Sequence, residues 1–269
     1  MKRNKIGKYE LLGSIGRGGF GNVYKATTEG GALFAIKVLN HYLKDHPIIV
    51  QRFFHEANML ATLNHKNICR LVDFFPDGPD YAIVLDYIDG VDLKAFMHMQ
   101  PDTLIPFDQA VKIATECISA FQYAYEKGII HRDIKPSNIM IDHMGKSIIT
   151  DFGIAVSVSD EAGYDVNGMI SAAYSAPERF REDIGVDDIR SDIYSLGIVF
   201  YELFTGRLPF DLNSRPEIKT WHQRGTALPA DIYIPSLPAS ITASIKTAIE
   251  KKPEKRFKDF LAFKRALGI

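Results

Sequence analysis

The sequence predicts an α+β fold in which a small β-rich lobe comes before a larger, mainly helical lobe. Short β-branched and apolar stretches separated by turn signals fill the first third of the chain. Stretches with apolar residues at helical spacing fill most of the remainder. A chain of 269 residues is long enough for two such lobes to share a cleft. We expect the lobes to meet near Tyr87.

The β-rich lobe, about residues 1–86, is expected to contain several strands and one helix. Apolar residues at helical spacing, including Phe53, Ala57 and Leu60, predict a helix over Gln51 to Leu63. The expected strands are Tyr9 to Ile15, Asn22 to Thr28, Ala32 to Leu39, Ile68 to Phe75 and Tyr81 to Tyr87. The turn signal Pro-Asp-Gly-Pro-Asp at 76–80 separates the last two strands.

Helical patterns dominate the second lobe, about residues 91–269. An amphipathic helix is expected over Asp108 to Lys127, where Gly128 stops it. The segment from Asp192 to Thr205 is apolar nearly all round, which predicts a helix buried inside the lobe. Pro253 is expected to open the last helix, whose inward face would carry Phe257, Phe260, Leu261 and Leu267.

Composition excludes several classes of protein. The net charge of −1 and pI of about 6.7 give no support for a nucleic-acid or anionic-membrane binder. Cys69 and Cys117 lie in apolar surroundings and form no CxxC pair, so we expect two buried thiols. No signal-peptide core and no run of about 20 apolar residues is present. We expect a cytosolic chain, or the cytosolic part of a longer protein with an anchor beyond residue 269.

The stretch Gly16-Arg17-Gly18-Gly19-Phe20-Gly21 could cradle phosphate groups. Glycines lack a Cβ, so backbone N–H groups can approach phosphate oxygens closely. A tight hairpin turn would use the same residues, and a GxGxxG motif alone does not decide between them. A dinucleotide fold needs a helix after the glycines. Here a strand-like segment, VYKAT, follows them, which disfavours that alternative.

Lys37 ends an apolar strand downstream of the glycines. A lone lysine at a strand end is most often solvated, but phosphate chemistry could use it as a point charge. It would then need a carboxylate to hold it. Glu56 lies on or beside the buried face of the expected helix, where an unpaired acid is costly.

The octet His131-Arg132-Asp133-Ile134-Lys135-Pro136-Ser137-Asn138 places charge between two apolar runs. It could be a solvated turn or a catalytic loop. Asp133 can accept the proton of an attacking hydroxyl, and Lys135 can neutralise charge on a transferred group. Asn138 offers the side-chain oxygen that Mg²⁺ binds. Asp151-Phe152-Gly153 could be another turn, or Asp151 could be a second metal ligand.

In order and spacing these residues resemble the eukaryotic-type protein kinase family, and bacterial serine/threonine members most of all. The resemblance runs from Gly16 to Arg256. It implies a two-lobed kinase fold forming one catalytic domain over 1–269, with a hinge at about 86–90. It also implies transfer of the γ-phosphoryl group of ATP to serine or threonine hydroxyls of proteins, the chain itself included. The cofactor would be Mg²⁺, with Mn²⁺ as an alternative.

The resemblance assigns a role to each site residue. Lys37 would contact the α- and β-phosphates and pair with Glu56, while Asp133 and Lys135 would act on the substrate hydroxyl and the transferred group. Asn138 and Asp151 would hold the metal. The nucleotide itself would contact Gly16, Gly18, Gly21, Val23, Ala35, Leu85, Met140 and the hinge residues Asp86 and Ile88.

Structural roles are implied as well. Ala176-Pro177-Glu178 matches the end of the activation segment, with Glu178 paired to Arg256. Asp192 would accept backbone hydrogen bonds from the catalytic loop. A spine joining the lobes would contain Leu60, Leu71, His131 and Phe152.

The segment before Ala176 departs from the family pattern. Ile170-Ser171 stands where the family commonly has Gly-Thr, and we expect the Ser171 hydroxyl to bridge Asp133 and Lys135. Arg132 precedes the catalytic acid, and kinases of that kind often need a phosphate to order the segment. We expect Arg132 to meet a phosphorylated serine or an acid of the segment. The candidates are Ser157, Ser159, Asp160, Glu161 and Asp165.

Three functions fit to different degrees. A catalytically inactive kinase-like binding module usually lacks at least one of Lys37, Asp133, Asn138 and Asp151, and all four are present. A small-molecule kinase tends to lack the Ala-Pro-Glu ending and its arginine partner. An active protein serine/threonine kinase therefore fits the sequence best.

Overall fold

The computed structural model describes residues 4–17, 21–40, 43, 45–78, 80–152, 171–180 and 188–269, without the side chains of Arg52 and Glu56. The chain divides into two compact units. Among the described residues, the first unit holds those up to Asp89 together with Phe152. The second holds Gly90–Asp151 and the described residues from Ser171 onward.

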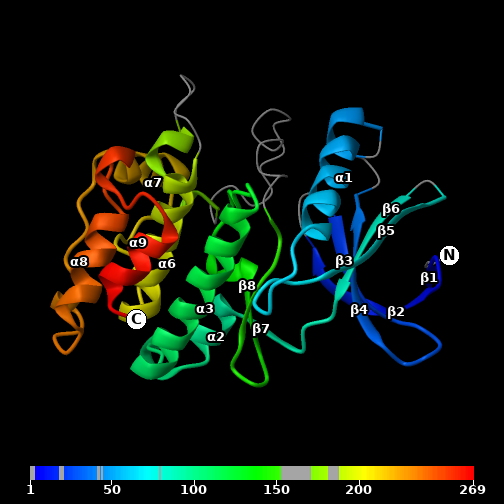
Figure 1. The fold of residues 1–269 in the computed structure, drawn as a ribbon, viewed down its shortest axis with the longest axis horizontal. Coiled ribbons are helices and arrows are strands. Elements are labelled where there is room, and N and C mark those ends of the chain that lie inside the picture. Colours follow the sequence, from blue (N-terminus) through cyan, green and yellow to red (C-terminus); the bar gives the residue numbers. More distant parts are fainter. Residues whose placement is uncertain are drawn as a thin grey trace. The chain divides into compact units, whose positions relative to one another are not determined.

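The first unit is built on an antiparallel sheet (Figure 1). Among the described residues its strand order is β1-β2-β3-β4-β6-β5. Sequential neighbours are joined by short connections, which favours antiparallel pairing. The strands are β1 (Lys5–Ile6), β2 (Tyr9–Arg17), β3 (Gly21–Thr27), β4 (Leu33–Leu39), β5 (Leu71–Asp77) and β6 (Asp80–Asp86).

The five expected strands are confirmed as β2 to β6, with boundaries shifted by one to three residues, and the short strand β1 was not expected. β5 begins at Leu71 and not at Ile68, because the Ile68 N–H donates to the His65 carbonyl and closes a turn first. The β5–β6 hairpin is tighter than expected. Asp77 and Asp80 already face each other across the ladder, and Gly78 adopts a φ of 62°, which glycine accepts without strain.

Helix α1 (Pro47–Ala61) packs against β5 (Figure 1). Phe54 meets Phe74 and Tyr81 edge-on, with ring centroids 6.0 and 5.1 Å apart. The expected helix began at Gln51, four residues too late, because Ile48, Ile49 and Val50 carry β-branched side chains. Pro47 is the stronger signal, since its fixed φ suits the first helical turn.

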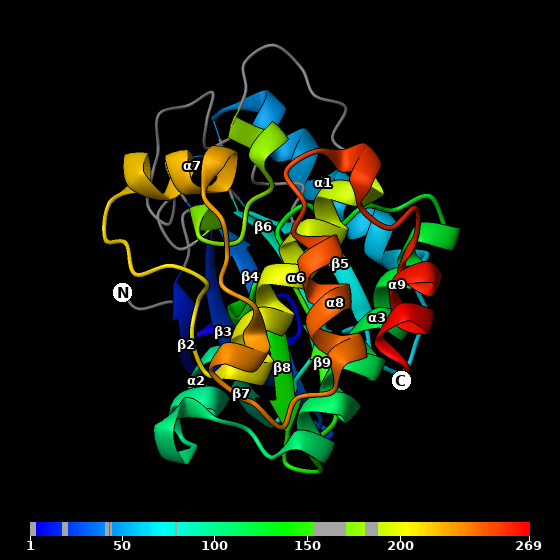
Figure 2. The same cartoon turned by 90° about the vertical axis from the view of Figure 1, so that its left-hand side faces the viewer.

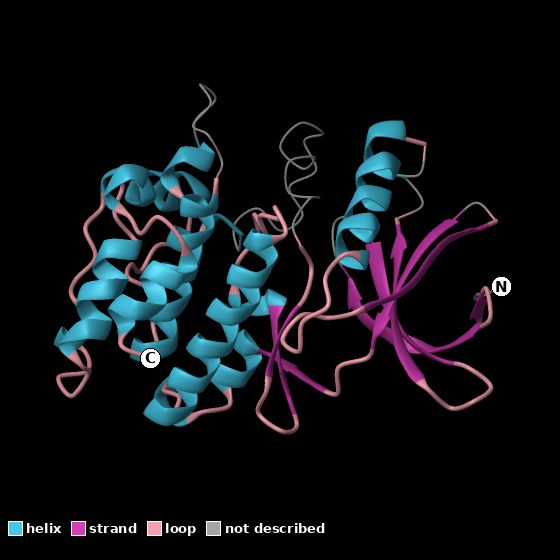
Figure 3. Cartoon of the chain, viewed as in Figure 1, coloured by secondary structure: helices cyan, strands magenta, loops and turns pink. Residues whose placement is uncertain are grey.

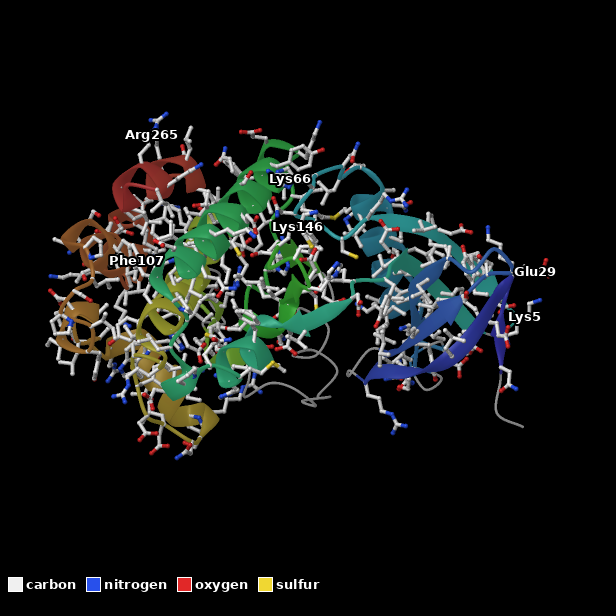
Figure 4. All side chains as sticks on the ribbon, turned by 90° about the horizontal axis from the view of Figure 1, so that it is seen from below. Lys5, Glu29, Lys66, Phe107, Lys146 and Arg265 are labelled. Atoms are coloured by element: carbon white, nitrogen blue, oxygen red, sulfur yellow. The ribbon has the colours of Figure 1, made fainter. Side chains whose placement is uncertain are left out.

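One face of the sheet forms the core of this unit. The buried cluster contains Ile6, Tyr9, Ala26, Ile36, Ala82 and Val84. The Tyr9 ring meets Phe34 edge-on and stacks on Phe75. Glu29, in the β3–β4 hairpin, and Lys5 are exposed away from this core (Figure 4).

The second unit is mainly helical (Figure 3). Its described strands form a small antiparallel sheet in the order β7-β8-β9. The strands are β7 (Gly90–Asp92), β8 (Ile139–Asp142) and β9 (Ser147–Ile149). The α-helices are α2 (Leu93–His98), α3 (Phe107–Glu126), α6 (Ile189–Thr205), α7 (Arg215–Arg224), α8 (Ala239–Ala248) and α9 (Phe260–Leu267). Short 3-10 turns occur at Pro101–Thr103, Pro136–Asn138, Pro177–Phe180, Ala230–Ile232 and Pro253–Lys255.

Helix α6 forms the centre of this unit. It contacts α3 and α8, and α9 packs against α3 and α8 (Figure 2). Nearly every residue of α6 is buried, as its all-round apolar sequence predicts. The Asp188 side chain caps the start of the helix, and Gly206 ends it with a φ of 71°.

The end of the chain differs from the expectation. Pro253 opens only a 3-10 turn, and α9 begins at Phe260. The Asp259 carboxylate accepts from the Ala262 N–H and is the actual helix cap. Phe260 and Leu267 are buried as predicted, whereas Leu261 is 41% exposed. An N-capping aspartate was therefore a better start signal than proline.

Three simpler expectations can be compared with the structure. Cys69 and Cys117 are both buried, as predicted, and neither forms a disulfide. Phe107 begins α3, one residue before the expected start, and remains partly exposed beside Phe204 (Figure 4). Within the described residues, no helix combines the length and apolar character that a bilayer crossing requires.

Candidate active site

The predicted nucleotide contacts of the first unit lie on one face of its sheet. Val23 faces Lys37 across the β3–β4 ladder, and Ala35 faces Leu85 across the β4–β6 ladder. Residues directly opposite or two apart in a ladder share a face. These four side chains therefore point away from the face that carries the buried core. Gly16 is paired with Val23 and begins the same row.

The described glycines of the predicted phosphate loop differ in whether the packing around them leaves room for a side chain. A Cβ on Gly21 would lie 2.4 Å from the Val38 carbonyl oxygen, so β3 can approach β4 here only with glycine. A Cβ on Gly16 would make ordinary contact with Val23. Packing therefore explains why position 21 is a glycine, but it does not explain why position 16 is one. Gly18 lies outside the described residues.

Lys37 lies within β4, between Val23 on β3 and Ile83 on β6. The backbone of Glu56 lies in α1, but its side chain is outside the described part of the structure. The predicted Lys37–Glu56 pair therefore remains a prediction.

The predicted hinge leaves β6 at Asp86. The Asp86 N–H donates to the Arg70 carbonyl, and its carboxylate accepts two hydrogen bonds of 2.9 Å from the Arg70 guanidinium. This ion pair joins the end of β6 to the segment before β5, and both side chains are exposed. Ile88 makes no hydrogen bond through its backbone within the described part of the chain, so its N–H is available to a ligand.

In the second unit, a buried carboxylate holds the predicted catalytic loop. Asp192 on α6 accepts from the His131 N–H at 2.6 Å and the Arg132 N–H at 2.9 Å, as predicted. Arg132 has a φ of 68°, a conformation that costs a non-glycine residue energy. The two charge-assisted hydrogen bonds to Asp192 offset that cost.

The side chains of the octet converge on Asp133. The Lys135 ammonium lies 2.7 Å from the Asp133 carboxylate, and the Asn138 amide donates to the same carboxylate at 3.0 Å. Lys135 also donates to the Ser171 hydroxyl at 2.8 Å. We expected Ser171 to bridge the other two residues, but Lys135 is the bridging group. The octet is therefore an ordered cluster and not a solvated turn.

His131 ties this loop to the strand end that carries Asp151. Its Nε2 lies 3.1 Å from the Thr150 carbonyl, and its Nδ1 is 3.3 Å from the Asp133 N–H. Burial lowers the pKa of His131 and outweighs the opposing effect of nearby carboxylates, Asp192 foremost. The neutral ring then donates to Thr150 through Nε2 and accepts from Asp133 through Nδ1. The Phe121 ring packs edge-on against it.

Asn138 and Asp151 are brought together by the β8–β9 ladder. The Thr150 N–H donates to the Asn138 carbonyl at 2.9 Å, and Asp151 is the next residue. The Asn138 amide nitrogen is engaged with Asp133, which leaves the amide oxygen as its ligand atom. Asp151 has a φ of 49°, an unusual conformation at a strand end.

These two side chains fit a hard divalent cation. Among the described residues, no group of three or more His, Cys, Asp and Glu side chains forms a complete metal cage. An amide oxygen and one carboxylate suit Mg²⁺, which takes its other ligands from water and substrate phosphates. They do not suit a structural zinc ion, which prefers four nitrogen or sulfur ligands.

The predicted ion pair at the end of the activation segment is present. Arg256 donates to both carboxylate oxygens of Glu178 at 2.6 and 2.8 Å, and Ser191 donates to the same carboxylate. Burial opposes the Glu178 charge, but these donors outweigh it and lower the pKa of Glu178. Arg256 also donates to the carbonyl of Arg190. The pair therefore joins the Pro177–Phe180 turn to α6.

The structure adds two groups that the sequence did not identify. Arg179 donates to the Arg132 carbonyl and to Asp192, both at 2.8 Å, and so supports the catalytic loop from the other side. Glu202, buried in α6, accepts from the Tyr174 hydroxyl and from Lys94. The only signal for Arg179 was its position next to Glu178.

Some predicted residues cannot be compared with the structure. The candidate partners of Arg132 lie outside the described residues, as does Ile170; these partners are Ser157, Ser159, Asp160, Glu161 and Asp165. Met140 lies on β8 opposite Asp92, in the second unit. The predicted spine draws on both units and stays a prediction.

A curled antiparallel sheet with one helix, followed by a helical unit that carries an aspartate-lysine-asparagine loop, defines the protein kinase fold. The chain belongs to the protein kinase family, because the family model "Protein kinase domain" matches residues 9–263. This confirms the family and the fold that the sequence predicted.

Individual relatives agree with this assignment. The chain is 38% identical over 255 residues to the serine/threonine-protein kinase PrkC of Bacillus subtilis, covering 93% of this chain and 38% of that protein. It is 35% identical over 259 residues to the serine/threonine-protein kinase PknB of Mycobacterium tuberculosis, covering 93% of this chain and 41% of that protein. The chain thus spans well under half the length of these relatives.

Solved structures show the same fold. A mutant kinase domain of PknI from Mycobacterium tuberculosis superposes with a TM-score of 0.76 at 25% sequence identity. The alignment covers 98% of this chain and 96% of that one.

Proposed function

We propose that this chain is an active protein serine/threonine kinase domain that transfers the γ-phosphoryl group of ATP to hydroxyl groups of proteins, its own included. Membership of the protein kinase family supports the use of ATP and a divalent metal. The printed names of PrkC and PknB support serine and threonine as acceptors. The observation that carries the proposal is the Asp133 carboxylate held between Lys135 and Asn138.

Each residue of this cluster has a defined task in the proposed reaction. Asp133 orients the substrate hydroxyl and accepts its proton as the oxygen attacks phosphorus. Lys135 spans Asp133 and Ser171, where its charge can stabilise the equatorial oxygens of the transferred group. Little covalent chemistry is required of the protein, so positions and charges account for most of the rate.

The cofactor proposal is ATP with Mg²⁺, with Mn²⁺ as an alternative. Asn138 and Asp151 would hold the metal, which when bound neutralises charge on the phosphate oxygens. Lys37, with Glu56 as its partner, would contact the α- and β-phosphates. The remaining nucleotide contacts would be Gly16, Gly18, Gly21, Val23, Ala35, Leu85, Asp86, Ile88 and Met140.

Several broader assignments accompany this function. We propose one catalytic domain over 1–269, with an N-lobe at about 1–86, a hinge at about 86–90 and a C-lobe at about 91–269. Its partners would be ATP and proteins with serine or threonine acceptors, and not nucleic acid. The domain would act in the cytosol, either alone or as part of a longer protein.

The test is phosphate transfer from labelled ATP to a generic protein acceptor and to the chain itself. Asp133→Asn keeps the shape and removes the base, and Asp151→Asn removes the metal carboxylate. We expect each variant to lose at least about 100-fold in turnover, a typical effect of removing a catalytic base or a preorganised charge. His143→Asn, at an exposed turn, is the matched surface control and should retain activity.

Two results would contradict the proposal. Full activity in Asp133→Asn would remove the assigned base. A wild-type chain that binds ATP and Mg²⁺ but transfers no phosphate would instead support an inactive binding module. Mapping the labelled residues by mass spectrometry would test the serine and threonine preference.

A further inference from the structure

We propose that His222 is a positioning residue for protein substrates, acting through the Ala173 carbonyl to hold the segment Ser171–Pro177 in its working shape. The inference rests on the proposed kinase function and deepens it. It assigns a role in substrate binding to a buried side chain on α7, outside the Asp133 cluster.

His222 is fully buried, with 0% exposure. Aromatic rings surround it. Tyr194 lies 5.6 Å away and Phe210 5.5 Å away between ring centroids, and the Phe180 ring stacks on the imidazole at 5.8 Å. A histidine in such a site must satisfy both ring nitrogens, because an unpaired buried polar atom is costly.

The hydrogen bonds of His222 have a defined direction. The Lys251 ammonium can only donate, and it contacts the Tyr194 hydroxyl oxygen at 3.3 Å. That hydroxyl therefore directs its own proton to His222 Nδ1, 2.8 Å away. The neutral imidazole then carries its proton on Nε2 and donates it to the Ala173 carbonyl at 3.1 Å. The order of donors fixes the tautomer.

Three separate parts of the second unit contribute to this chain of bonds. Tyr194 comes from α6, His222 from α7, and Lys251 from just beyond α8. The Lys251 ammonium also lies 4.1 Å from the centre of the Trp221 ring and donates to the Trp221 carbonyl at 3.3 Å. Lys251, Tyr194 and His222 are thus held in place by contacts that do not involve the segment Ser171–Pro177.

The acceptor end lies beside the Asp133 cluster, to which the proposed function must bring the hydroxyl of a protein substrate. Ala173 is two residues from Ser171, whose hydroxyl accepts from Lys135 of the catalytic cluster. It is also adjacent to Tyr174, whose hydroxyl is bound by Glu202. These two contacts hold side chains, whereas His222 holds the main chain between them.

Loss of the His222 bond should therefore affect the peptide more than the nucleotide. The Asp133–Lys135–Asn138 cluster has its own support, because Asp192 accepts from the loop N–H groups and His131 Nδ1 accepts from the Asp133 N–H. The Ser171–Pro177 main chain, in contrast, would lose a buried donor. Hydrogen-bonded segments that lose one anchor sample more conformations and bind a partner less well.

The test compares His222→Phe with His222→Gln. Phenylalanine keeps the aromatic volume and removes both nitrogens, while the glutamine amide can still donate to Ala173. Steady-state kinetics on the full chain would give KM for a peptide acceptor and KM for ATP. The rate of ATP hydrolysis without peptide is the internal reference, and His143→Gln is the surface control.

We expect His222→Phe to reduce kcat/KM for the peptide by about threefold to tenfold, the range for one lost hydrogen bond, mainly through a higher peptide KM. KM for ATP and peptide-independent hydrolysis should stay within about twofold of wild type. His222→Gln should recover most of the peptide effect. A folded His222→Phe with wild-type peptide kinetics, or one that loses ATP hydrolysis in parallel, would overturn the proposal.

A second variant makes the test independent of His222→Phe. A hydrogen-exchange measurement makes it independent of the proposed function. If His222→Phe does not fold, His222→Leu removes both ring nitrogens with a smaller apolar side chain, so the same shift in peptide KM decides. Hydrogen exchange over 171–177 needs no phosphate transfer. Faster exchange in the variant supports the role of His222 even if the wild type is inactive, and unchanged exchange opposes it.

Discussion

At the scale of single residues, Lys135 shows how a charge can serve two partners. It lies within hydrogen-bonding distance of the Asp133 carboxylate and the Ser171 hydroxyl. The sequence identified all three residues but predicted that Ser171 would bridge the other two. Lys135 bridges Asp133 and Ser171 because its ammonium has three donors, whereas a hydroxyl has only one.

His222 predicts a pH dependence of stability. Burial, with Lys251 nearby, lowers the pKa of His222 to about 3 from an ordinary value of 6.5. Between these two values the unfolded chain binds a proton at this site that the folded chain does not. The free energy of unfolding should therefore fall as pH decreases from about 6.5 to 3, by up to about 1.4 kcal/mol per pH unit from this group.

Denaturant unfolding of wild type and His222→Gln at several pH values would measure this contribution. All other titrating groups are shared, so the difference between the two curves isolates the histidine. We expect the wild-type curve to be steeper below pH 6.5. Parallel curves would show that His222 becomes protonated in the folded protein as readily as in the unfolded one.

At the scale of elements, distant segments are joined by a small number of buried polar contacts. The Glu178–Arg256 pair connects the turn at Pro177–Phe180 with the segment before α9. Arg179, the next residue, reaches the catalytic loop. The Pro177–Phe180 turn therefore connects the end of the segment Ser171–Pro177 with both α6 and the predicted catalytic loop.

Arg256→Met should destabilise the protein by about 3–5 kcal/mol, because it leaves the Glu178 carboxylate buried with no opposing charge. Arg190→Met is the matched control. The Arg190–Asp188 pair is also close, at 2.7 Å, but it is far more exposed, with 35% and 28% of the two side chains accessible. Its loss should cost about 0–1 kcal/mol.

Chemical denaturation of both variants at pH 7 would give the two values. The physical argument concerns the uncompensated acid, so replacing Glu178 with Gln in the Arg256→Met background should recover part of the loss. Equal destabilisation by Arg256→Met and Arg190→Met would contradict it.

At the scale of the whole molecule, the proposed nucleotide contacts are divided between two compact units. Val23, Ala35, Lys37 and Leu85 lie on one face of the sheet in the first unit. Met140 and the proposed metal ligands Asn138 and Asp151 belong to the second unit. A ligand that binds only the folded chain raises its free energy of unfolding with the logarithm of the ligand concentration once that concentration exceeds Kd.

We therefore expect ADP with Mg²⁺ to raise the unfolding temperature of the wild type. At a ligand concentration about 100 times Kd, the gain is about 2.7 kcal/mol, or roughly 5–10 °C for a chain of this size. Lys37→Met removes an assigned phosphate contact and should require a higher nucleotide concentration for the same shift. Lys66→Met, the same substitution at an exposed turn of the same unit and outside the assigned contacts, is the control. An identical titration for Lys37→Met and wild type would remove Lys37 from the nucleotide site.

The sequence by itself determined strands β2 to β6, the helices α1, α3 and α6, and the residues of the predicted catalytic octet. These features are local: apolar periodicity, turn residues and motif spacing are all properties of short stretches. Where local signals competed, the prediction failed, as at the β-branched first turn of α1 and at Pro253, where Asp259 sets the start of α9.

Only the tertiary structure decided which polar side chains meet. His222 reaches Ala173 across 49 positions, and Arg179 reaches Arg132 across 47. No short pattern marks either contact, because packing brings the partners together and burial then requires every polar atom to find one. The residues of the predicted catalytic octet are close together in the sequence. The residues that hold them in place are neighbours only after the chain has folded.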